Sequence, residues 1–108
     1  MSLNKFAKYL TEIEYPKRKT SWDIAGIIKG QNAFYKFDVR TLIKESNNRA
    51  YKPGNFKTKA DKTVFELEDR WVVLDIEELH TYIKKHKLKD LELTDLIKKL
   101  DWTIEVLK

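Results

Sequence analysis

The most regular pattern of apolar and polar residues lies between residues 64 and 86. Residues 64–67 alternate apolar and polar side chains, which predicts a half-buried strand, and residues 71–74 form a second, wholly apolar strand. The charged residues 68–70 between these strands predict a tight turn. We therefore expect a β-hairpin at about residues 63–74 in the centre of the fold.

A helix is predicted directly after this hairpin. Asp75 is expected to be its N-cap, with the Asp75 carboxylate accepting the backbone N–H of Glu78 and the Glu78 side chain returning to the N–H of Asp75. Leu74 and Leu79 occupy the two positions of a hydrophobic staple. The apolar spacing predicts a buried helix face that contains Ile76, Leu79 and Ile83.

Two helices are predicted near the start of the chain. Apolar residues at helical spacing predict a helix over residues 3–14. A second helix is predicted over residues 22–29, between Ser21 as its N-cap and Gly30 just after its end. A strand over residues 24–28 is the alternative for this second segment, because a glycine inside a helix costs about 1 kcal/mol relative to alanine.

The pattern around Asp38 repeats the strand-to-helix pattern described above. Residues 33–37 predict a short strand, and Asp38 is expected to cap a helix over about residues 39–46. The sequence FDVRTL at 37–42 matches LDIEEL at 74–79 in character, which indicates either an internal βα repeat or the shared chemistry of two helix starts. We favour the second interpretation because only six positions match.

The last part of the chain predicts a helix followed by a strand. Thr94 is expected to cap a helix that contains Leu96, Ile97 and Leu100, and residues 102–107 alternate as a strand does. A helix-turn-helix over residues 93–108 is the alternative. Its second helix would have only six residues, rich in β-branched side chains that favour a strand.

Length and composition narrow the class of protein. The 108 residues are expected to form a single α+β domain, residues 1–108, with a small, largely antiparallel sheet and helices packed on one face. The absence of cysteine excludes disulfides, thiolate catalysis and cysteine zinc sites. No apolar run approaches the roughly 20 residues of a membrane span, and the first residues lack the apolar segment of a signal peptide. We therefore expect a cytoplasmic protein without membrane contact.

Positive charge is concentrated in the first part of the chain. Residues 1–62 contain 14 Lys or Arg and 6 Asp or Glu, a net charge of +8, whereas residues 63–108 contain 8 and 11, a net charge of −3. This asymmetry indicates an anionic partner for the first part, although a general enrichment in lysine would produce the same balance.

Residues 46–62 form the best candidate for a binding site. This segment shows neither helical nor strand periodicity, and long loops inside compact domains are often functional. Its cations can neutralise phosphates and its aromatic side chains can stack on bases. The expected nucleic-acid-binding residues are Arg49, Tyr51, Lys52, Phe56, Lys57, Lys59 and Lys62, extended by Lys17, Arg18 and Lys19 if the fold brings them alongside.

We therefore expect a small, non-enzymatic protein that binds nucleic acid through this loop, without cofactor or metal. The alternative is a protein-interaction module, such as a small inhibitor or accessory factor, that binds an acidic protein surface. Trp22, Trp71 and Trp102 are expected to pack in the core or along its rim.

Metal-dependent phosphodiester cleavage is the third hypothesis. Such a site needs carboxylates that converge on one or two ions, usually beside a lysine. A strand acid followed within three residues by lysine is found only at Glu105 and Lys108, and capping and solubility explain the acids near the hairpin better. His80 and His86 are six residues apart, which is the wrong spacing for a shared metal on one helix.

Overall fold

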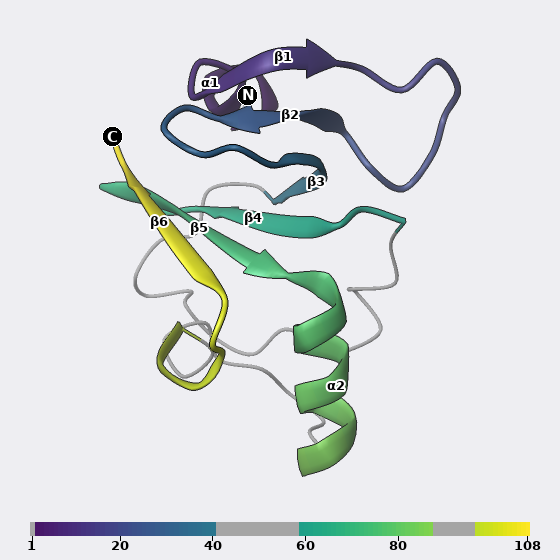
Figure 1. Cartoon of the computed structure of the whole chain (residues 1–108), viewed down its shortest axis with the longest axis vertical. Helices are drawn as coiled ribbons and strands as arrows, with labels where there is room; N and C mark the ends of the chain where they lie inside the picture. Colours follow the sequence, from purple (N-terminus) through teal and green to yellow (C-terminus); the bar gives the residue numbers. More distant parts are fainter. Residues whose placement is uncertain (1, 41–58, 88–96) are drawn as a thin grey trace.

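A curled sheet of six strands dominates the fold (Figure 1). The computed structural model describes residues 2–40, 59–87 and 97–108. Within these residues the strands are β1 (Leu10–Glu14), β2 (Ile24–Ile28), β3 (Phe34–Arg40), β4 (Lys62–Glu66), β5 (Arg70–Asp75) and β6 (Thr103–Leu107). The helices are α1 (Ser2–Ala7) and α2 (Ile76–His86), and residues 97–99 are also helical. The fold is α+β, with α2 as its main helix.

The order of the strands in the sheet follows their order in the chain. Every neighbouring pair is antiparallel except β3 and β4, which run parallel. Two parallel strands cannot be joined by the tight turn that joins an antiparallel hairpin. The parallel pair is therefore a junction between an N-terminal meander and a C-terminal one.

The sheet has an apolar core on each face. On β5, Trp71 and Val73 belong to a core cluster with Phe6 of α1, whereas Val72 and Leu74 belong to a second cluster with Leu79 of α2. The prediction that helices pack on one face is therefore wrong, because β4 and β5 are buried along their length and both of their faces need cover.

The predicted hairpin and the helix after it are confirmed, but its first strand, β4, is buried on both faces and not half-buried as predicted. β4 and β5 pair antiparallel, and Asp75 accepts the N–H of Glu78 through Oδ2 at 2.9 Å as the N-cap of α2. Leu79 is fully buried, so the predicted helix phase is right. The returning half of the capping box is wrong, because the Glu78 carboxylate accepts the backbone N–H groups of Asp101 and Trp102 instead.

The two helices predicted near the start of the chain are wrong in large part. The first ends at Ala7, and residues 10–14 form β1. The second is β2, the alternative considered above, and Gly26 has a steric role there. A Cβ atom at Gly26 would lie 2.8 Å from the carbonyl oxygen of Thr11 on the neighbouring strand. Glycine therefore permits the close approach of β1 to β2.

Asp38 is not a helix cap, because it lies inside β3 and its backbone is paired with β4. The repeat of a strand and a capped helix is therefore not reproduced at Asp38, and most of the predicted helix over 39–46 lies outside the described residues. Residues 103–107 form β6, which excludes the helix-turn-helix and confirms the predicted final strand.

Candidate nucleic-acid interface

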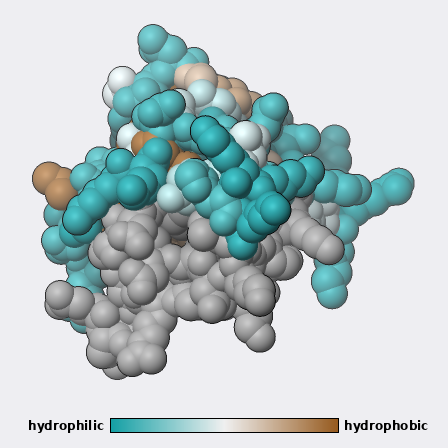
Figure 2. All heavy atoms as spheres, turned by 90° about the horizontal axis from the view of Figure 1, so that it is seen from below, coloured by the Kyte–Doolittle hydropathy of each residue, from teal (hydrophilic) through white to brown (hydrophobic). Residues whose placement is uncertain are grey.

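The structure describes half of the predicted binding residues. Lys17, Arg18, Lys19 and Lys59 are exposed to solvent. Lys62 is also described. Five predicted residues of the loop lie outside the described residues: Arg49, Tyr51, Lys52, Phe56 and Lys57. On the face shown in Figure 2 the described surface is mostly hydrophilic, with apolar residues only in small groups.

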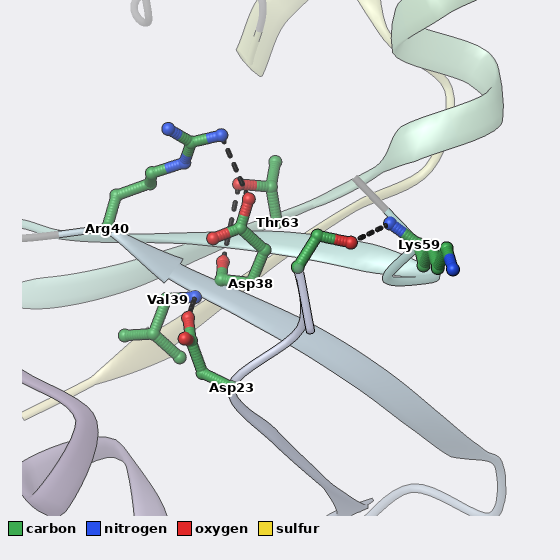
Figure 3. A network of polar contacts seen from close by, with 7 residues as sticks. Asp23, Asp38, Val39, Arg40, Lys59 and Thr63 are labelled. Atoms are coloured by element: carbon green, nitrogen blue, oxygen red, sulfur yellow. Dashed lines mark hydrogen bonds and ion pairs between the residues drawn. The ribbon is translucent and has the colours of Figure 1, made fainter. Parts of the chain in front are cut away.

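A hydrogen bond joins the two basic segments. The backbone N–H of Lys59 donates to Ser21 Oγ at 2.7 Å, although these residues are 38 positions apart (Figure 3). Ser21 follows the basic run 17–19 by two residues, so this bond brings the run to the end of the predicted basic loop. We call the exposed cations Lys17, Arg18, Lys19 and Lys59 the basic junction.

Lys62 lies apart from the basic junction. It begins β4, so the predicted loop ends earlier than residue 62, and only 5 % of its surface is exposed. Its Nζ atom is 2.5 Å from Asp75 Oδ1 and lies 4.3 Å and 3.8 Å from the ring centroids of Tyr35 and Trp102. The charge of Lys62 is thus balanced by Asp75 inside the protein, and little of the side chain is exposed to solvent.

A hollow of about 560 Å³ adjoins this ion pair. Lys62 and Asp75 line it together with Tyr35, and α2 contributes Glu77, His80 and Lys84 along its length. The lining of the hollow contains both acidic and basic side chains. It therefore favours the binding of an anion less than the basic junction does.

Next to the basic junction lie two carboxylates, one just before β2 and one within β3. The backbone N–H of Asp23 donates to the carbonyl oxygen of Phe37 at 2.8 Å, which brings Asp23 close to Asp38, the next residue of β3. The Asp23 carboxylate accepts the backbone N–H of Val39 at 2.8 Å, and Asp38 Oδ2 accepts Nη2 of Arg40 at 2.9 Å (Figure 3). The negative charge of Asp23 disfavours the ionised form of Asp38, so this pair of like charges costs folding energy.

The surroundings of Asp38 raise its pKa. Burial raises the pKa of Asp38 above its ordinary value of 3.8, and the negative charge of Asp23 raises it further, whereas the Arg40 guanidinium lowers it. The combined effect of burial and Asp23 is larger than the effect of Arg40, so the pKa is raised overall. Asp38 therefore gains a proton, or would accept a cation, more readily than an exposed aspartate.

Sequence reasoning missed this pair because each residue fitted another pattern. Asp23 fell inside a predicted helix, and Asp38 had the apolar neighbours of an N-cap. The available signal was the order Asp38-Val39-Arg40, an acid followed two residues later by a cation. That spacing resembles the one sought for phosphodiester cleavage, with arginine in place of lysine.

Comparisons with protein-family models, with curated proteins and with solved structures found no match. Within the described residues there is no group of three or more His, Cys, Asp or Glu side chains that could hold a metal ion. The described helices include none that is long and apolar enough to cross a membrane. The function therefore has to be argued from the site alone.

Proposed function

We propose that this protein binds nucleic acid, and that the basic junction contacts the phosphate backbone. The observation that carries the proposal is the hydrogen bond between Lys59 and Ser21, because it joins two basic segments that are far apart in sequence. Cations gathered at one place neutralise several phosphates of the same strand and release their counterions.

A salt titration tests this proposal. For a labelled oligonucleotide, log affinity should fall linearly with log salt concentration, with a slope of about −0.7 to −0.9 per phosphate neutralised. Alanine at Lys17, Arg18, Lys19 and Lys59 should flatten that slope by about 3 units, about 0.7 to 0.9 for each of the four cations lost. Fluorescence anisotropy at several salt concentrations measures both values.

A matched control removes the same charge elsewhere. Lys84, Lys85, Lys98 and Lys99 are exposed and lie on or after α2, so their replacement by alanine should leave the slope almost unchanged. Equal loss in both variants would mean that only net charge matters. If the wild type binds no oligonucleotide at about 150 mM salt, the proposal fails and an acidic protein partner becomes the better hypothesis.

A second function, metal-dependent cleavage of the phosphodiester bond, is favoured by the Asp23–Asp38 pair. Mg²⁺ is commonly held by one or two carboxylates, with water and substrate phosphates as its other ligands. Two carboxylates beside a phosphate-binding surface fit that chemistry, even without a third acidic ligand. A divalent cation there would relieve the repulsion between the carboxylates and polarise the phosphate, and Arg40 would help to balance the charge that develops on it.

Asp38→Asn separates cleavage from binding. We expect the wild type to cut labelled DNA or RNA only with Mg²⁺ or Mn²⁺ present, and the variant to lose cutting but to keep binding in EDTA. Asp69→Asn, which alters an exposed acid in the β4–β5 turn, is the control and should still cut. If the wild type cuts neither substrate with either metal, this second function is excluded while the binding proposal stands.

A further inference from the structure

Trp22 has a different environment from the other two tryptophans. Trp71 is buried in the core cluster of α1, and Trp102 packs against that cluster. Trp22 is half-buried, and within the described residues it is part of neither core cluster. Of the two predicted locations, the core or its rim, the core is therefore excluded for Trp22 within these residues.

The surroundings of Trp22 are basic. Ser21, its neighbour in the chain, accepts the hydrogen bond from Lys59, and the basic run 17–19 ends three residues earlier. The ammonium group of Lys36 lies 5.5 Å from the centroid of the Trp22 ring. A large aromatic ring therefore lies among cations at the point where the two basic segments meet.

We propose that Trp22 stacks on an unpaired base, so that the protein prefers single-stranded nucleic acid. This inference rests on the proposed nucleic-acid binding and specifies the substrate of the same site. An aromatic face beside a positively charged groove is the arrangement by which proteins bind single strands without regard to sequence. In a duplex the base faces are already stacked on one another, so Trp22 gains no contact there.

The test compares single-stranded oligo(dT) with a blunt duplex of the same length, by fluorescence anisotropy in EDTA. Trp22→Ala should weaken single-strand binding by roughly 5- to 150-fold, the range for loss of one stacked base. Its effect on duplex binding should be less than about twofold. Trp22→Phe should recover a large part of the loss, because it keeps an aromatic face.

Phe34→Ala is the matched control. Phe34 is an exposed aromatic residue paired with Ile27, at the far end of β3 from Trp22, and its removal should change neither affinity. A second measurement does not depend on the alanine variant folding. Oligo(dT) should quench the tryptophan fluorescence of the wild type, and most of that quenching should be absent in Trp22→Phe.

The outcomes separate this inference from the function on which it rests. Selective loss of single-strand binding in Trp22→Ala, or loss of quenching in Trp22→Phe, supports stacking. If the wild type binds oligonucleotides but Trp22→Phe is quenched like the wild type and Trp22→Ala affects both substrates equally, stacking is wrong and backbone binding stands. A wild type that binds neither substrate overturns both.

Discussion

Asp38 and Asp75 lie in similar sequence surroundings but in opposite electrostatic ones. Asp75 ends β5, caps α2 and forms an ion pair with Lys62, so its negative charge stabilises the fold. Asp38 lies within β3 near Asp23, and burial and the charge of Asp23 raise its pKa in spite of the neighbouring Arg40. A carboxylate that costs folding energy where it lies is a better candidate for function than one that stabilises the fold.

The strongest test of this contrast is Asp75→Ala. The substitution removes a helix cap and leaves the buried ammonium of Lys62 between two aromatic rings without a carboxylate. Breaking a buried pair costs about 3–5 kcal/mol, so we expect the free energy of unfolding to fall by at least about 3 kcal/mol. Urea denaturation measures it. A loss below about 1 kcal/mol would mean that the ion pair contributes nothing.

Asp75→Asn divides the same loss into its two parts. Asparagine is as good an N-cap as aspartate, so this variant keeps the cap and loses the charge. It should be more stable than Asp75→Ala by about 1 kcal/mol, the usual contribution of a cap. Equal stability of the two variants would show that the cap is redundant beside the other contacts of α2.

The smallest expected effect has the opposite sign. Asp38→Asn removes a negative charge that burial and the repulsion with Asp23 disfavour, and it should raise the free energy of unfolding at pH 7 by a few tenths to about 1 kcal/mol, the range for charge pairs on a sheet. Urea denaturation at pH 7 measures the difference. A variant less stable than the wild type would show that the ion pair with Arg40 outweighs the repulsion.

The pH dependence of this difference gives an independent check. A carboxyl group with a raised pKa binds its proton more tightly in the folded state, so its penalty is absent well below pH 3.8 and is complete above the raised pKa. The stability advantage of Asp38→Asn should therefore grow as pH rises from about 3 towards 7. An advantage that shrinks over this range would contradict the raised pKa.

What the sequence determined by itself is the C-terminal meander and its helix. There, contacts between near neighbours decide the structure: the alternation of β4, the apolar run of β5 and the capping oxygen of Asp75 all act within a few residues. Residues 103–107 belong to the same group, because their β-branched side chains favour a strand. These local preferences agree with the fold, so they could be recognised without it.

Only the tertiary structure decided the first forty residues and the candidate site. The apolar spacing of residues 3–14 fits a helix, but Leu10 and Thr11 gain strand partners in β2, and pairing outweighs the weak helix preference. The parallel pairing of β3 with β4 took Asp38 out of a capping position, and the contact between Asp23 and Phe37 placed Asp23 near it. Partners 13 to 40 residues apart created the basic junction, the carboxylate pair and the burial of Lys62, and no local pattern encodes which distant strand a residue will meet.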